Sequence, residues 1–145
     1  MLWGSARATV DGKGRLKIPA AFKPYMDENG AEFYVTSLDG QSVRIYPLSQ
    51  WREIEEKVKA KPSMDKSVKK FLARTNYFGQ MGRADSQGRL LIPSVLRESA
   101  AMHGEVVVFD NLKYLAVWND QRFRAHLESE PLTEEDEKEL SGYGI

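Results

Sequence analysis

The chain has 145 residues and no cysteine, and its 21 Lys and Arg side chains equal its 21 Asp and Glu side chains in number. Without cysteine it has neither a disulfide framework nor thiolate chemistry. No stretch approaches the ~20 apolar residues of a membrane helix, and the N-terminus lacks an apolar run that ends in a cleavage site. We therefore expect a cytoplasmic protein with no membrane partner.

The neutral total hides an uneven distribution of charge. Residues 128–145 hold seven acids and one base, so the preceding 127 residues hold 20 bases and 14 acids. This segregation fits a polyanionic partner bound by a basic body with a solvated acidic tail. It fits equally well a soluble surface that is simply uneven.

A nine-residue motif occurs twice, at residues 11–19 and 85–93, with Asp, Gly, Arg, Leu, Ile and Pro in matching places. Such a period in a short chain indicates two units of supersecondary size. A unit of about 60 residues buries only a marginal core alone, so we expect the two units to share one. The predicted division is a first unit at 5–62, a connecting helix at 63–78, a second unit at 79–129 and an acidic C-terminal tail at 130–145.

In chain order, the first unit begins with two predicted half-buried strands, because apolar and polar residues alternate on either side of residues 11–14. Between them Asp11 can accept backbone N–H groups, and Gly14 can supply the positive φ of a tight turn. Pro19 favours the first position of a helix, and Ser49 is a candidate helix cap. The predicted elements that follow are a helix over 20–25, strands over 32–35 and 43–46, and helices over 49–61 and 63–77.

The second unit repeats this order. Asp85 and Gly88 predict the same turn, and Pro93 predicts a helix over 94–102. Strands are expected over 105–108 and 115–118, followed by a closing helix. The aromatic residues of both units are expected to anchor the core or an interface rather than to stack on bases; they include Trp3, Tyr46, Trp51 and Trp118.

Arg15 and Arg89 directly follow the two turns and have two compatible interpretations. Each can pair with the Asp at the start of its turn and lock the hairpin, or each can reach DNA, because a two-stranded ribbon fits the major groove. The candidate DNA-binding residues share a place on or beside the hairpins and a side chain that donates hydrogen bonds. They are Arg7, Lys13, Arg15, Lys17, Lys23, Arg83, Gln87, Arg89 and Arg97.

Nothing in the sequence indicates catalysis. His103 and His126 are the only histidines, and neither has a metal-ligand neighbour at a helical spacing that recurs in the other unit. There is no Walker loop, no nucleophile elbow and no dinucleotide-binding glycine motif. We expect no enzyme, no metal and no cofactor.

The motif Asp-x-x-Gly-Arg-Leu-x-Ile-Pro resembles the signature of the AbrB-like swapped-hairpin DNA-binding fold. Two copies in a chain of this length resemble the MraZ family of bacterial transcriptional regulators, and the resemblance covers nearly the whole chain, including residues 1–4, Tyr46 and Trp51. It implies an α+β fold, in which two tandem swapped-hairpin units related by a pseudo-twofold axis form a barrel-like domain with peripheral helices.

The same resemblance implies a function. It is that of a sequence-specific regulator bound to promoter-proximal direct repeats upstream of the division and cell-wall gene cluster. Ring-shaped homo-oligomers on double-stranded DNA, associated with the nucleoid, are implied as well.

Two alternatives stay open. The first is an antitoxin of the same fold, with a DNA-binding half and a partner-binding tail at 130–145; the second copy of the motif argues against it, because such antitoxins usually have one. The other is an interaction scaffold that binds no nucleic acid, which a DNA-binding assay would distinguish.

Overall fold

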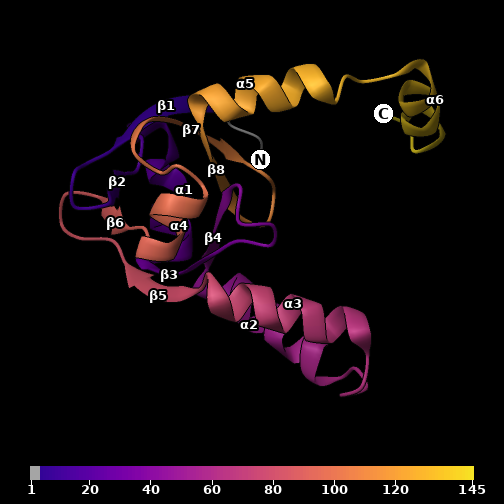
Figure 1. Cartoon of the computed structure of the whole chain (residues 1–145), viewed down its shortest axis with the longest axis horizontal. Coiled ribbons are helices and arrows are strands. Elements are labelled where there is room, and N and C mark those ends of the chain that lie inside the picture. The colour runs from indigo at the N-terminus through magenta and orange to yellow at the C-terminus, as the bar shows by residue number, and fades with distance from the viewer. Residues whose placement is uncertain (1–3) are drawn as a thin grey trace.

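The computed structural model describes residues 4–145, so Trp3 and most of the matching N-terminal segment lie outside the described residues. Within that range the chain forms eight strands and seven helical segments (Figure 1). They are β1 (Ser5–Val10), β2 (Arg15–Lys17), η1 (Ala20–Phe22), α1 (Lys23–Asn29), β3 (Glu32–Thr36), β4 (Val43–Pro47), α2 (Leu48–Lys59), α3 (Lys66–Tyr77), β5 (Gln80–Arg83), β6 (Arg89–Leu91), α4 (Ser94–Ser99), β7 (Gly104–Asp110), β8 (Leu115–Asn119), α5 (Asp120–Ser129) and α6 (Glu134–Gly142).

The eight strands form one antiparallel sheet in which the two units exchange strands. The order is β5-β3-β4-β8-β7-β1-β2-β6, so β3 of the first unit pairs with β5 of the second and β1 pairs with β7. The outer strands β5 and β6 also contact each other, which nearly closes the sheet into a barrel. If each strand is replaced by its counterpart in the other unit (β1 by β5, β2 by β6, β3 by β7, β4 by β8), the same circular order results, read in the opposite direction. The α+β class and the pseudo-twofold, barrel-like arrangement of swapped hairpins are therefore confirmed.

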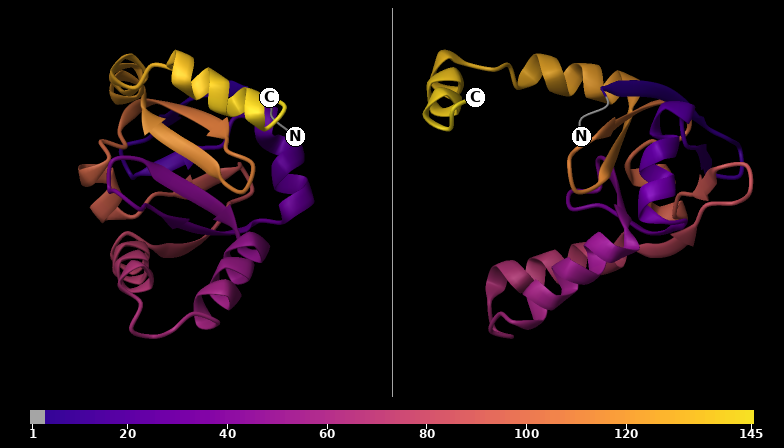
Figure 2. Two further views of the ribbon diagram at one scale, coloured as in Figure 1. Left: turned by 90° about the vertical axis from the view of Figure 1, so that its right-hand side faces the viewer. Right: turned by 180° about the vertical axis from the view of Figure 1, so that it is seen from behind.

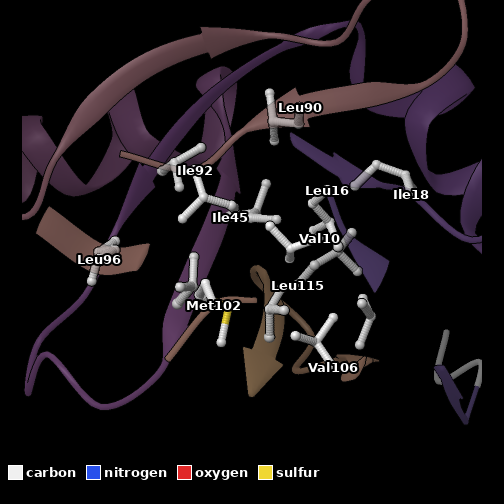
Figure 3. Close-up of a cluster of buried hydrophobic side chains, with 14 of the residues drawn as sticks. Val10, Leu16, Ile18, Ile45, Leu90, Ile92, Leu96, Met102, Val106 and Leu115 are labelled. Atoms are coloured by element: carbon white, nitrogen blue, oxygen red, sulfur yellow. The ribbon is translucent and has the colours of Figure 1, made fainter. Parts of the chain in front are cut away.

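The two units share a single hydrophobic core inside the barrel. Alternate residues of each strand point inward, as the period of a half-buried strand requires, and Figure 3 shows Leu16, Leu90, Ile92 and Leu115 converging there from both units. All four are completely buried. Burying one such side chain stabilises the fold by about 1.5–3 kcal/mol, so neither unit could retain this core alone.

Two neighbouring leucines on β6 test this account of the core. Leu90 is completely buried, whereas Leu91 points outward and is 42% exposed. We expect Leu90→Ala to lower the free energy of unfolding by about 2–5 kcal/mol, because it removes buried methyl groups and leaves a cavity. Leu91→Ala should cost less than about 1 kcal/mol. Urea denaturation of the two variants measures the difference, and equal losses would show that the outer face of β6 is packed as well.

Most predicted elements are present, with shifted ends. Pro19 and Pro93 precede their helices with extended ψ values of 142° and 141°, so their prediction as first helical residues is wrong by one position. The Ser49 cap is also wrong, because α2 begins at Leu48 directly after Pro47. The acidic tail contains α6, which had not been expected.

The helices α2, α3, α5 and α6 form two arms that leave opposite edges of the barrel and extend to the same side of it. Figures 1 and 2 show α2 and α3 leaving the barrel side by side at one end, and α5 leading to α6 at the other. The turns that join β1 to β2 and β5 to β6 project from a third side, away from both arms. No helix within residues 4–145 is both long and apolar enough to cross a membrane.

The base of the α2–α3 arm is anchored by aromatic residues. Tyr46 and Trp51 are buried, and Trp51 stacks on Tyr34 with ring centroids 4.3 Å apart. This confirms that both residues are anchors of the fold. Trp118 of β8 is only partly buried and stacks on His126 of α5 with centroids 4.8 Å apart.

Candidate nucleic-acid interface

The two Asp-x-x-Gly-Arg turns have the same hydrogen-bond pattern. The Asp11 carboxylate accepts the backbone N–H groups of Lys13 at 2.9 Å and of Arg15 at 3.0 Å. Gly14 has a φ of +81°, and its N–H donates to the carbonyl of Asp11 at 2.9 Å. The predicted tight turn is therefore present, because the acid organises the loop and glycine alone adopts the required φ without strain.

The second turn reproduces this geometry. The Asp85 carboxylate accepts the N–H groups of Gln87 and Arg89, both at 2.9 Å, and Gly88 has a φ of +73°. Residues 74 positions apart thus make the same hydrogen bonds, so this turn geometry is a property of the repeated motif. The sequence predicted both turns correctly.

Hydrogen bonds lower the pKa of both turn carboxyls. For Asp11 the largest cause is the backbone N–H of Arg15, and the guanidinium of Arg15 and the N–H of Lys13 add to it. The pKa of Asp85 is lowered in the same way by Arg89 and Gln87. Both carboxylates are therefore ionised at neutral pH and can hold a cation beside the turn.

Each Arg pairs with the acid of its own turn through one nitrogen. The Nε of Arg15 lies 2.8 Å from Asp11 Oδ2, and the Nε of Arg89 lies 2.9 Å from Asp85 Oδ2. Within residues 4–145 the four terminal Nη groups of these two arginines make no hydrogen bond or ion pair. The pairing interpretation is confirmed, and it leaves a guanidinium edge with its donors free and its direction fixed.

Strand exchange brings the two turns together. In the antiparallel pairing of β2 with β6, Arg15 lies opposite Leu91 and Lys17 lies opposite Arg89, while the residues between them point into the core. The Nζ of Lys17 donates to the carbonyl of Gln87 in the other turn. Three cations from two distant segments thus share one outward face of a two-stranded ribbon.

Hydrogen bonds between the units fix the spacing of the hairpins. The N–H of Ile18 donates to the carbonyl of Gly88 at 2.9 Å, and the N–H of Ile92 donates to the carbonyl of Gly14 at 2.8 Å. Each turn is therefore held by the strand end of the other unit. A rigid pair of turns is pre-organised for a rigid ligand.

Four further predicted residues lie near this ribbon. Arg7 and Lys17 line one shallow hollow, and Lys17, Lys23 and Gln87 line a second hollow of about 650 Å³ between the first unit and the second turn. Lys13 is exposed at the tip of the first turn. The structure brings these donors together around β2 and β6.

The remaining two predicted residues are engaged within the chain. Arg83 lies at the end of β5, largely exposed, and its Nη1 is 3.3 Å from Glu32 Oε1. The Nε of Arg97 donates to the carbonyl of Ile92 at 2.9 Å, and its guanidinium lies directly over Gly14, where a Cβ would collide with it. Arg97 therefore supports the first turn from behind.

Within residues 4–145 no three His, Asp or Glu side chains are grouped so that they could hold a metal ion.

A family model described as "MraZ protein, putative antitoxin-like" matches residues 1–74 and 82–141. The chain belongs to the MraZ family. It is 47% identical over 146 residues to the transcriptional regulator MraZ of Acidobacterium capsulatum and 44% identical over 147 residues to that of Koribacter versatilis. A third relative of the same name, from Caldanaerobacter subterraneus, is 33% identical over 149 residues. All three comparisons cover the full length of both chains, which confirms the resemblance drawn from the repeated motif.

Proposed function

We propose that this chain is a sequence-specific DNA-binding regulator of transcription whose chemistry is binding alone. The observation that supports this most strongly is the pair of arginines on the β2–β6 ribbon. Arg15 and Arg89 are each oriented by a carboxylate and each retain free Nη donors. Because Arg can bond to guanine O6 and N7 together, two fixed guanidinium groups suit the edges of bases in the major groove.

The surrounding donors suit the backbone of the same DNA. Arg7, Lys13, Lys17 and Lys23 lie around the ribbon and would bind phosphates, which sets affinity and register. Arg15 is assigned to base readout first, and Arg89 with Gln87 second, because fewer cations surround the second turn. Arg83 and Arg97 act indirectly, through the ends of the hairpins.

The family resemblance supports a proposal for the target sites and the assembly. The curated relatives are named transcriptional regulators, and the family resemblance points to direct repeats near the promoter of the division and cell-wall gene cluster. One chain offers only two small hairpins, so occupation of short repeats requires several chains acting at high effective concentration. We propose a closed ring of identical subunits, bound to the nucleoid in the cytoplasm.

The family description also includes the word antitoxin-like, which supports a second candidate. In that function the tail at 130–145 would bind a separate protein while the hairpins bind DNA. The two equivalent turns favour the first proposal, since both units retain the acid, the glycine and the oriented arginine.

Competition between two DNA duplexes tests the proposed specificity. One duplex contains the direct repeats from the upstream region of the chain's own gene, and the other has the same composition with the repeats scrambled. We expect binding to the repeats to be at least about 10³-fold tighter at physiological salt. Equal affinities would reject sequence-specific recognition, and no binding to either duplex would favour the scaffold alternative.

A further inference from the structure

The helix α6 stands apart from the rest of its own chain. Figures 1 and 2 show it clear of the barrel and of the other arm, and none of its residues is buried. Thr133 and Asp136 form a capping box at its start. Among the described residues, the hydrogen bonds of residues 133–145 all lie within that segment. An isolated helix shorter than about 12 residues is marginal in water, so this nine-residue helix requires a surface to pack on.

The C-terminal segment that contains α6 also has exposed apolar side chains. Leu127, Leu132, Tyr143 and Ile145 are all more than half exposed. They are interspersed with the seven acids of residues 128–145, which have a single base among them. Residues 127–145 therefore form an acidic segment with exposed apolar side chains at its two ends, and α6 packs on no other part of residues 4–145.

The other arm has the complementary surface. A groove of about 530 Å³ runs between α2 and α3, and its apolar lining is Trp51, Ile54, Val58, Val68, Phe71 and Leu72. Leu72 is 41% exposed, and the rings of Trp51 and Phe71, which also line the groove, stack with centroids 6.1 Å apart. An apolar groove between two helices is a usual site for a third amphipathic segment.

The rim of this groove is basic. Residues 57–74, which form the end of the arm, hold seven bases and one acid, and the charged residues that line the groove directly are Lys59, Lys61 and one acid, Glu55. Within residues 4–145 only Lys59 among these seven is in an ion pair, an exposed one with Glu56 at 3.3 Å. The excess of bases equals the excess of acids in residues 128–145.

The two surfaces lie apart within residues 4–145. The arms leave the barrel at opposite edges and extend to the same side of it (Figure 1), and only the short segment between Ser129 and Glu134 separates α6 from α5. Four residues span at most ~14 Å when extended. A contact between different ends of identical chains is heterologous, and such contacts can close into a ring.

We infer that residues 127–145 of one chain bind in the α2–α3 groove of a second copy, with apolar side chains in the groove and acids on its basic rim. The inference rests on the proposed ring and names the surfaces that close it. The hairpins lie on a third side of the barrel, so the contact leaves the DNA-binding ribbon uncovered.

A charge exchange between full-length chains tests the inference. One variant reverses the groove with Lys61→Glu, Lys66→Glu and Lys69→Glu. The other reverses the arm with Glu128→Lys, Glu130→Lys and Glu139→Lys, which spares the capping box and the acidic first turn of α6. Light scattering at micromolar concentration should give each variant alone the mass of a monomer, 16.5 kDa, and their equimolar mixture the mass of the unaltered assembly.

Controls separate the possible failures. Lys113→Glu and Glu28→Lys change exposed charges outside both arms and should leave the assembly unchanged. Reversed variants that keep the unaltered mass would overturn the inference while the ring stands, and so would a mixture of folded variants that stays monomeric. An unaltered chain that is itself monomeric would reject the ring and this interface together. Rings that do not bind the repeats would instead reject the proposed DNA function.

A second measurement requires no change of charge and serves if a reversed variant fails to fold. Because the chain has no cysteine, any disulfide formed in a mixture of the Leu72→Cys and Leu140→Cys proteins reports on these positions alone. We expect heterodimers to predominate on mild oxidation. A mixture that yields only Leu72 homodimers, or no crosslink, would show that the arm binds elsewhere, as a separate partner protein would require.

Discussion

Replacing Arg15 with alanine is expected to abolish binding to the direct repeats while the fold persists. A bidentate contact between Arg and guanine contributes about 1–3 kcal/mol, which is about a 5- to 150-fold loss of affinity for each hairpin. In the proposed ring several hairpins bind together, so these losses multiply. The guanidinium is partly exposed and bonds only to Asp11 within the described part of the chain, so its loss should change the melting temperature little.

Matched variants make this prediction specific. Arg15→Lys keeps the positive charge but not the planar pair of donors, so it should retain binding to scrambled DNA and lose the preference for the repeats. Arg89→Ala should cause a smaller loss, because its turn has fewer cations around it. Affinity measurements on both duplexes, with circular dichroism of each variant, provide the comparison. A collapse of the fold in Arg15→Ala would show that the residue is structural.

Raising the salt concentration is expected to weaken DNA binding steeply. Each phosphate contact contributes about 0.9 to the slope of log affinity against log salt. If two neighbouring subunits each place Arg7, Lys13, Lys17 and Lys23 on phosphates, the slope is about −7, and affinity falls about 10⁴-fold between 50 and 200 mM salt. Titrations of one duplex at several salt concentrations measure the slope.

Single substitutions measure how much each residue contributes to the slope of log affinity against log salt. Lys13→Ala should reduce it by about 0.9 for each subunit in contact with DNA. Lys113→Ala, outside the hairpins, should leave it unchanged. A response to salt that is nearly flat for the unaltered protein would contradict the proposed phosphate contacts.

The local parts of the candidate interface were predictable from the sequence. Asp11 and Gly14 specify the turn through their own backbone preferences, and the repeat supplied the same evidence at Asp85 and Gly88. The inward residues of β2 and β6 follow from alternation. The sequence could not specify which strands pair across the units. A repeat shows which segments of the two units correspond, but it does not show which strands lie next to each other in the sheet.

The pairing of β2 with β6 decides which residues the candidate interface contains. It places Lys17 beside the second turn, where its Nζ reaches the carbonyl of Gln87. Equivalent positions also differ in role: Arg97 covers Gly14, but no side chain covers Gly88, and Lys23 lines an open hollow instead. The only sequence signal for this difference is Arg in one unit where the other has Lys.

The structure of the acidic tail could not be predicted from its composition alone. Its composition indicated a solvated appendage, and the helix α6 was missed. The signal that could have revealed it is Thr133 followed three residues later by Asp136, the spacing of a capping box. Its direction, away from the barrel, depends on what it packs against and could not be read from its own residues.

Footprinting on the DNA upstream of the chain's own gene would show sequence-specific binding by the hairpins in one experiment. Protein at increasing concentration is bound to that DNA at physiological salt, and cleavage of the backbone is mapped base by base. We expect discrete protected segments that recur with the spacing of short direct repeats and disappear with Arg15→Ala. Uniform protection along the whole fragment, or protection that Arg15→Ala leaves intact, would contradict sequence-specific binding by the hairpins.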